Sequence, residues 1–316
     1  MAERTFDFTS LDTFQTCRKK YYYRMVKNLV PNTVAPALEF GKAIHLALEA
    51  YYKNGCNLEM ALDAFTHNYA DREGDDRRTI ENGIKVLRGY AEVYKNEPFK
   101  VIDTEVGFAV PISNMVTEED NVTRCNTCGM AVDGTEQKEC PGCLTPYSII
   151  LCGRLDALVD WDGQLYVLEH KTSSSLGMNY FKQFEINMQV DGYVYAATEL
   201  TGRQCLGAVI NVLEVWKDVK KPTAKTKTLE EHYARDPQGR SVYELDEYKK
   251  DVPRIVRDLL EAERTGNFYR NKRSCFSYNY KCPYWDICKY GENDKLIARD
   301  FKEEKWEPYK QVEEES

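Results

Sequence analysis

At 316 residues, the chain is long enough to form one large domain or two modest ones with a substantial core. No apolar run approaches the roughly 18 residues of a membrane-spanning helix, and the first residues lack the basic and apolar regions of a signal peptide. The net charge of −8 argues against a generally basic nucleic-acid-binding surface, although a locally basic groove is compatible with it. We therefore expect a cytoplasmic protein that does not bind membranes.

Eleven cysteines are the most unusual feature of the composition. In a reducing compartment, metal binding explains them better than disulfides do. Four form a compact set, three lie close together near the end of the chain, and the rest are scattered.

The first hundred residues are predicted to be mainly helical, with helices over about 10–27, 38–53, 57–72 and 79–96. Ser10 can cap the first helix, and Cys17 lies on its apolar face. The Lys and Arg residues of that helix face either phosphates or only solvent. His45 lies off the apolar stripe of the second helix, where a lone histidine is more often a polar neighbour of the core than a ligand.

Strand character begins at Phe99, and residues 153–172 (GRLDALVDWDGQLYVLEHKT) are predicted to form two strands joined at Asp162-Gly163. Asp-Gly is among the strongest hairpin signals, because both turn residues must accept a positive φ. This turn fixes the register of the two strands, so that Trp161 faces Gln164 and Val159 faces Tyr166.

The same register places Asp156 opposite Glu169, about 5 Å away, with Lys171 on the same face of the strand. Two carboxylates and a lysine at one spot are typical of a divalent cation site. A solvated hairpin with a salt bridge is the alternative. Glu105, in the preceding strand, either joins the carboxylates or faces water.

Residues 111–149 interrupt the strands and contain two Cys-x-x-Cys knuckles separated by eleven residues, with Cys125, Cys128, Cys140 and Cys143. Four thiolates at this spacing indicate a closed structural site with zinc as the expected ion, and rubredoxin-like iron or a chance spacing are the alternatives. The insert has too little apolar content for its own core, so the metal would supply its folding energy.

The second half of the chain is predicted to contain a helix over about 179–200, a buried strand over 207–216, a polar and basic loop over 217–240, and a helix over 252–265. The loop is a candidate for phosphate contact. Gln189 and Tyr193 share one face of the first of these helices. The residues from Asp300 onward are expected to be solvated and partly disordered.

The last cysteines, Cys275, Cys282 and Cys288, lie within fourteen residues. Three cysteines make an incomplete four-ligand site, and Cys17 is the fourth ligand that the sequence offers.

Six motifs occur in order along the chain: FTSLDTFQTCRKKYYYRMV with Cys17, GKAIHLALE with His45, GRLDALVD with Asp156, EHKT with Glu169 and Lys171, QVDGY with Gln189 and Tyr193, and CPYWDIC with the closing cysteines. In these motifs the chain resembles the RecB-like branch of the PD-(D/E)XK nucleases. That branch includes nuclease domains of bacterial recombination helicase–nucleases, CRISPR-associated spacer-acquisition exonucleases and related phage exonucleases. The resemblance spans roughly residues 6–290 outside the 111–149 insert, whose role is not inherited. Arg18 follows Cys17, where the family commonly has proline.

The resemblance implies an α/β fold of the restriction-endonuclease-like PD-(D/E)XK type, with a central mixed sheet flanked by helices. We expect a helical region over 1–98 packed on a nuclease core over 99–290, a zinc-ribbon-like insert over 111–149, and a polar tail over 291–316.

The resemblance further implies that Mg²⁺ or Mn²⁺ is bound by His45, Asp156, Glu169 and the backbone carbonyl of His170. Lys171 would stabilise charge developing on the phosphate or ease deprotonation of the attacking water. Gln189 and Tyr193 would orient the DNA strand and the side of the site that carries Lys171. Glu105 corresponds to a variable acidic position and would have a supporting role only.

A [4Fe–4S] cluster held by Cys17, Cys275, Cys282 and Cys288 is also implied. It would join the first helix to the C-terminal segment and have a structural rather than a redox role. Buried free thiols are the alternative.

The function implied is that of a metal-dependent DNA exonuclease acting on single strands or duplex ends, in recombination, repair or CRISPR spacer acquisition. A non-catalytic subunit that uses the same fold to grip DNA for a helicase or integrase is the second possibility, and the complete set of catalytic residues argues against it. In a third interpretation, the zinc insert is a protein-docking module through which the nuclease is regulated.

Overall fold

The computed structural model describes residues 4–33, 35–72, 75–117, 122–132, 137–217, 226–277 and 280–307. The chain forms two compact units, each assembled from separate segments of sequence. The first unit comprises residues 1–33, 107–153 and 242–316, and the second comprises residues 34–106 and 154–241. Among the described residues, no helix is long and apolar enough to cross a membrane.

The central sheet is mixed and has the strand order β1-β6-β7-β8-β9, with β3 also paired to β6. Its strands are β1 (Thr5–Asp7), β3 (Lys100–Ser113), β6 (Ser148–Trp161), β7 (Gln164–Ser173), β8 (Cys205–Glu214) and β9 (Tyr233–Gly239). β7 and β8 are parallel, whereas β6 with β7 and β8 with β9 are antiparallel. The predicted α/β class with a central mixed sheet flanked by helices is confirmed.

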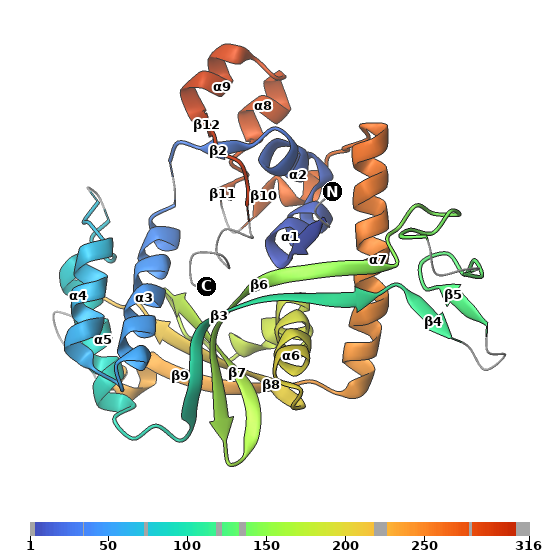
Figure 1. Cartoon of the computed structure of the whole chain (residues 1–316). Helices are drawn as coiled ribbons and strands as arrows, with labels where there is room; N and C mark the ends of the chain where they lie inside the picture. Colours follow the sequence, from blue (N-terminus) through green and yellow to red (C-terminus); the bar gives the residue numbers. More distant parts are fainter. Residues whose placement is uncertain are drawn as a thin grey trace. The chain divides into compact units, whose positions relative to one another are not determined.

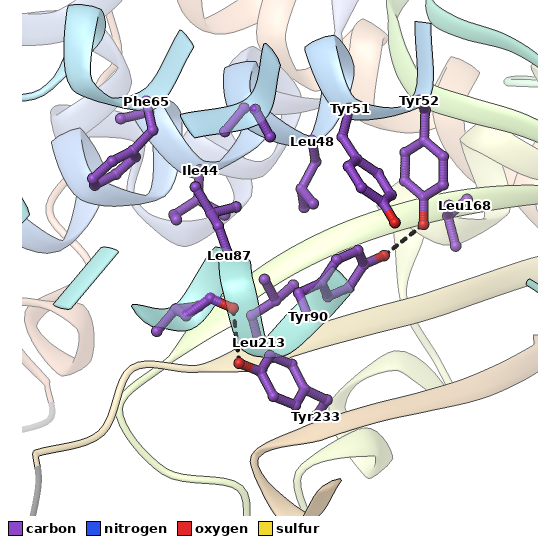
Figure 2. Packing of buried hydrophobic residues seen from close by; sticks show 14 of the residues in the cluster. Ile44, Leu48, Tyr51, Tyr52, Phe65, Leu87, Tyr90, Leu168, Leu213 and Tyr233 are labelled. Carbon is purple, nitrogen blue, oxygen red and sulfur yellow. Dashed lines mark hydrogen bonds between the residues drawn. The ribbon is translucent and has the colours of Figure 1, made fainter. Parts of the chain in front are cut away.

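In the second unit, three helices stand together and share one core with the sheet (Figure 1). They are α3 (Pro36–Lys53), α4 (Leu58–Asn68) and α5 (Ile80–Val93). Ile44 and Leu87 from these helices pack in one cluster with Leu168 and Leu213 from the strands (Figure 2). A further helix, α6 (Met188–Thr201), packs on β7 and β8. β8 is therefore buried along nearly its whole length, as expected of a parallel strand covered by helices.

The N-terminal helix is interrupted, contrary to the prediction of one helix over 10–27. Its elements are α1 (Phe8–Thr16), α2 (Arg18–Tyr21) and the π-helical turn η1 (Tyr22–Val26). Asp7, rather than Ser10, caps α1, and its carboxylate accepts a hydrogen bond from the backbone N–H of Ser10. The backbone at Cys17 is extended, which ends α1 and starts α2.

The helix predicted over 179–200 begins later, at Met188. Asn187 is its cap and accepts hydrogen bonds from the backbone N–H groups of Gln189 and Val190, which defines the first turn. The residues before it form only a short 3₁₀ turn, η2 (Phe181–Phe184).

The prediction of a loop over 217–240 is wrong for residues 230–239, which form the 3₁₀ turn η3 (Glu230–His232) and the strand β9. β9 is an edge strand of the sheet and contains Pro237, which an edge position tolerates. Residues 218–225 of the predicted phosphate-contacting loop lie outside the described part of the chain. The next helix, α7 (Val242–Thr265), also starts earlier than the predicted residue 252.

In the first unit, the chain after Asp300 is more ordered than predicted over the part that the structure describes. The helices α8 (Trp285–Tyr290) and α9 (Asp294–Asp300) precede this part, and it begins with β12 (Phe301–Glu303), which is antiparallel to β2 (Leu29–Pro31). Phe301 is buried against Tyr284, and Trp306 donates a hydrogen bond to Asp7. The aromatic residues account for the difference, because they bury apolar area in a segment that is otherwise polar. Residues 308–316 lie outside the described part.

Gly207 and Gly239 pair across β8 and β9 and give a matched test of this packing. A Cβ atom on Gly207 would lie 2.3 Å from the backbone oxygen of Gln238, whereas the nearest atom to a Cβ on Gly239 would be 3.8 Å away. We expect Gly207→Ala to destabilise the protein by about 1–3 kcal/mol, because backbone must move to make room. Gly239→Ala should change the midpoint of thermal unfolding little, and equal midpoints for the two variants would contradict this account.

Candidate metal-binding and catalytic site

The β6–β7 hairpin is built as its turn sequence predicts. Asp162 and Gly163 both have positive φ, 51° and 81°, as a two-residue turn of this kind requires. Cross-strand pairs run from Trp161 with Gln164 to Ala157 with Leu168, which confirms the predicted register.

The last paired residues of the two strands are Ala157 and Leu168. At the next residue, Asp156, the side chain rather than the backbone makes the hydrogen bond between the strands. Its Oδ2 accepts a hydrogen bond of 2.7 Å from the backbone N–H of His170. Its Oδ1 lies 3.3 Å from Nδ1 of His45 in α3. The structure thus brings the histidine of the second predicted helix to the carboxylate of the hairpin, although their positions in the chain are 111 residues apart.

Glu169 and Lys171 project from the same face of β7, as predicted. Lys171 Nζ lies 2.5 Å from Glu169 Oε1 and 3.4 Å from Oε1 of Gln189. Gln189 in turn donates from Nε2 to the Tyr193 hydroxyl at 2.9 Å, so that two residues of α6 extend the cluster. The second unit therefore brings together all six side chains that the resemblance implies for catalysis: His45, Asp156, Glu169, Lys171, Gln189 and Tyr193.

The electrostatics of the cluster are those of crowded buried carboxylates. Burial, followed by the charge of Asp156, raises the pKa of Glu169 to about 7. Burial opposes ionisation of Asp156, but His45 outweighs it and holds the pKa of Asp156 well below its usual range. Burial likewise opposes the charged form of His45, and Asp156 more than offsets it and raises the pKa of His45 to about 9. The pKa of Lys171 is raised because Glu169 outweighs the effect of burial.

The donor set fits a hard divalent cation. Glu169 Oε2 is buried and has no hydrogen-bond partner among the described residues. A buried carboxylate oxygen without a partner is costly, and a cation beside it would remove that cost. Carboxylate oxygens with one imidazole are also the ligands that Mg²⁺ or Mn²⁺ accepts.

Glu105 is largely buried and close enough to Asp156 to feel its charge, rather than facing water. It has φ of 51°, an uncommon left-handed conformation for a residue in a strand. Its side chain is mostly buried and accepts a hydrogen bond of 3.2 Å from Arg154. Burial, together with nearby Asp156, raises the pKa of Glu105 to about 7. The regular alternation of a strand could not have shown this orientation, because the left-handed residue changes the phase.

A second polar network lies behind the site, and the sequence analysis missed it. The imidazole Nδ1 of His170 lies 2.8 Å from Nδ2 of Asn211, which makes Nδ1 an acceptor and leaves the other ring nitrogen protonated. Asn211 Oδ1 accepts from Nε of Arg235, and Arg235 forms a double ion pair with Glu97. Asn211 is the one strongly polar residue inside the apolar run GAVINVL, and that contrast was the available signal.

Tyrosines complete this network. Arg235 also donates to the hydroxyls of Tyr52 and Tyr90, which lie 2.6 Å from each other (Figure 2). The Tyr52 ring stacks on the His170 ring. The network therefore holds the segment of β7 whose other face carries Glu169 and Lys171.

The four cysteines of the insert converge, as predicted. Their ligand atoms all lie within 4.8 Å of one another. The Cys125–Cys143 and Cys128–Cys140 sulfur distances are 3.7 and 3.5 Å. Four sulfurs placed tetrahedrally at about 2.3 Å from one ion would be about 3.8 Å apart, so the geometry fits a single metal ion.

The remaining four predicted cysteines gather in the first unit. Cys17, Cys275, Cys282 and Cys288 all line one cavity of about 330 Å³. Cys17 Sγ accepts a hydrogen bond of 3.3 Å from the backbone N–H of Asn271. Among the described residues, no three of these sulfurs are grouped as closely as those of the insert.

A known protein family matches nearly the whole chain. The model of the PD-(D/E)XK nuclease superfamily matches residues 5–289. A crystal structure of a candidate exonuclease from Eubacterium rectale has 9% sequence identity and a TM-score of 0.46, covering 92% of this chain and 88% of that one. The crystal structure of SSO0001 has 17% identity and a TM-score of 0.32, covering 90% of this chain and 100% of that one. No curated protein matches the chain significantly.

Arg235 and Arg203 allow a matched test of the network behind the site. Arg235 is 8% exposed and pairs with Glu97, whereas Arg203 is 47% exposed and pairs with Asp160. We expect Arg235→Leu to cost about 3–5 kcal/mol of unfolding free energy, because it leaves Glu97 without its cation. Arg203→Leu should cost less than about 1 kcal/mol.

Chemical denaturation of the two variants measures the difference. Adding Glu97→Leu to the Arg235→Leu protein should recover part of the loss, since the unpaired carboxylate is then removed. Similar losses for the two single variants would show that the Arg235 pair is not buried as described.

Proposed function

The chain belongs to the PD-(D/E)XK nuclease superfamily, and from this we propose that it is a Mg²⁺- or Mn²⁺-dependent deoxyribonuclease of the RecB-like type. We propose further that it is an exonuclease acting on single-stranded DNA or duplex ends in recombination, repair or CRISPR spacer acquisition. The observation that supports this best is the gathering of His45, Asp156, Glu169 and Lys171, with a buried Glu169 oxygen that lacks a partner.

In this proposal, His45, Asp156, Glu169 and the His170 carbonyl hold the cation. When bound, the cation would neutralise the scissile phosphate and activate the attacking water. The hydrogen bond from the His170 backbone to Asp156 fixes one carboxylate, and Lys171 orients the other by pairing with Glu169.

Lys171 is positioned to do more than pair with Glu169. Its ammonium group is shared between Glu169 and Gln189, and Gln189 is itself held by Tyr193. A positive charge so placed can stabilise the charge that develops on the phosphate as the new phosphorus–oxygen bond forms and the bond to the leaving sugar breaks. Gln189 and Tyr193 thus act as positioning residues.

We also propose a [4Fe–4S] cluster at Cys17, Cys275, Cys282 and Cys288, in support of which all four line a single cavity. The hydrogen bond from Asn271 to Cys17 is of the kind that stabilises a thiolate ligand. The role of the cluster would be structural, because it would join the first helices to the C-terminal cysteine segment.

For the insert we propose a structural Zn²⁺ at Cys125, Cys128, Cys140 and Cys143. Sulfur distances that suit a tetrahedral ion support this. The small core cluster of the insert, with Cys125, Cys140 and Tyr147 as its buried members, would leave most of the folding energy to the metal. The insert is then free to act as a docking site for a protein partner.

Lys171→Ala tests the nuclease assignment. We expect the variant to lose at least about 100-fold of its Mn²⁺-dependent degradation of end-labelled DNA, because a charge aimed at the reacting phosphate is removed. Lys100→Ala, which removes an exposed lysine at the start of β3, should degrade DNA like the unchanged protein. Circular dichroism and the visible spectrum should be the same for all three proteins, and full activity of Lys171→Ala would refute the assignment.

Metal analysis tests the two cysteine sites separately. In protein purified without oxygen, Cys17→Ala should lose iron and visible absorbance but keep zinc, whereas Cys140→Ala should lose zinc and keep iron. Cys56→Ala, which removes an exposed cysteine, should keep both. Iron retained in full by Cys17→Ala, or zinc retained in full by Cys140→Ala, would contradict the corresponding site.

A further inference from the structure

The loop between β7 and α6, residues 174–187, carries two unusual side chains. Met178 and Ile186 are 101% and 94% exposed, the highest values among the large apolar residues of the described chain. Single exposed apolar residues are common on protein surfaces. These two are notable because of where the loop lies and how it is held.

The loop connects the two elements that carry the proposed catalytic residues. The loop begins three residues after Lys171 and ends two residues before Gln189. Nζ of Lys171 lies 3.4 Å from Oε1 of Gln189. Tyr180, within the loop, interacts electrostatically with Lys171. The loop therefore lies next to the residues that are proposed to contact the scissile phosphate.

Three basic side chains fix the loop backbone. Arg77 donates to the carbonyl oxygen of Ser174 at 3.1 Å, Lys227 to that of Leu176 at 3.2 Å, and Arg240 to that of Phe184 at 2.7 Å. The loop backbone is thus anchored at Ser174, directly after β7, and at Phe184, four residues before α6 begins.

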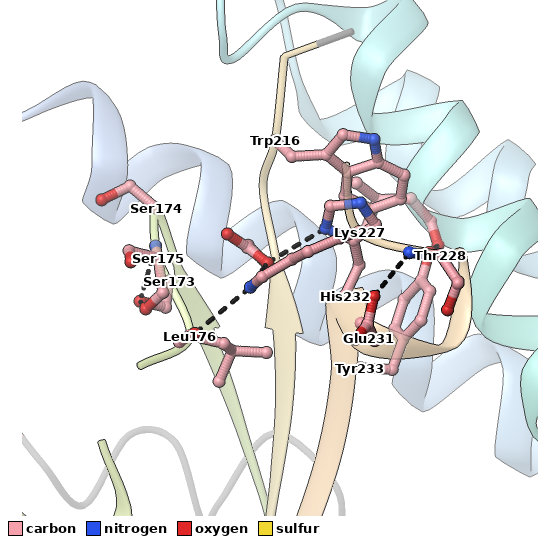
Figure 3. A network of polar contacts seen from close by, with 12 residues as sticks. Ser173, Ser174, Ser175, Leu176, Trp216, Lys227, Thr228, Glu231, His232 and Tyr233 are labelled. Carbon is pink, nitrogen blue, oxygen red and sulfur yellow. Dashed lines mark hydrogen bonds and ion pairs between the residues drawn. The ribbon is translucent and has the colours of Figure 1, made fainter. Parts of the chain in front are cut away.

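The anchors are themselves held. Lys227 also donates to Glu214 at 2.7 Å, and the same carboxylate oxygen lies 3.0 Å from Nδ1 of His232 (Figure 3). The His232 ring stacks on Trp216 with 3.9 Å between ring centroids. Arg240 is buried and also pairs with Asp191 of α6. Met178 and Ile186 are therefore exposed on a loop whose backbone is fixed by these hydrogen bonds.

We propose that Met178 and Ile186 contact the nucleobases of the DNA strand bound at the catalytic site. This rests on the proposed nuclease function and deepens it. A strand that presents its phosphates to Lys171 and the cation directs its bases away from them, and unstacked bases need apolar partners. Ile and Met are among the side chains that DNA-binding proteins insert between bases. An anchored loop loses little conformational entropy when the bases bind.

Binding of fluorescein-labelled DNA tests the inference. The double variant Met178→Ala/Ile186→Ala is compared with the unchanged protein by fluorescence anisotropy in Ca²⁺, with an ordinary single strand and with a strand of the same length whose central nucleotides are abasic. We expect about a tenfold weaker affinity of the variant for the ordinary strand, a typical value for losing one base-stacking contact. For the abasic strand we expect less than a twofold change, since the bases that these side chains contact are missing.

Leu38→Ala is the control, because it truncates a 68%-exposed apolar side chain of α3 in the same unit. Unchanged affinity of the double variant for the ordinary strand would overturn the inference and point to a protein partner for these side chains. An equal loss on both strands would also overturn it, because the contact would then be with the sugar–phosphate backbone. Failure of the unchanged protein to bind or degrade either strand would instead refute the proposed function.

Discussion

The repulsion between two buried carboxylates, Asp156 and Glu169, is the constraint around which the second unit is arranged. Removed from water, neither carboxylate can ionise cheaply beside the other. His45, the backbone of His170 and Lys171 each offset part of that cost from a different direction. Oε2 of Glu169 still has no hydrogen-bond partner among the described residues, so the site favours a positively charged ligand.

The strand β7 serves two polar centres at once. Successive side chains point to opposite faces, so Glu169 and Lys171 face the catalytic cluster while His170 faces the network of Asn211, Arg235 and Glu97. Buried polar groups that are all paired resist displacement, because any shift leaves a donor or acceptor unsatisfied. The rear network thereby limits movement of the backbone that presents the two catalytic side chains.

The features that could be predicted from sequence are those in which local chemistry decides the structure. The Asp162-Gly163 turn has the positive φ that its sequence requires, and the cysteines of the two knuckles converge, so both of these features were predicted correctly. The extended break at Cys17 and the left-handed Glu105 depend on contacts between distant segments, which residue spacing does not report. β9 was missed for a related reason, since an edge strand can be polar and can contain a proline.

The first unit is assembled from three separate stretches of the chain, and this affects the order in which it can fold during translation. β1 pairs with β6, Arg4 pairs with Glu263, and Asp7 accepts a hydrogen bond from Trp306. During translation, residues at the start of the chain must therefore wait for partners that are made as late as Glu263 and Trp306. The last segment of the second unit ends at residue 241, so this unit can fold while the last segment of the first unit is still being made. Cys17 is likewise made early, whereas the other three cysteines that line its cavity, Cys275, Cys282 and Cys288, are made only after the second unit is complete.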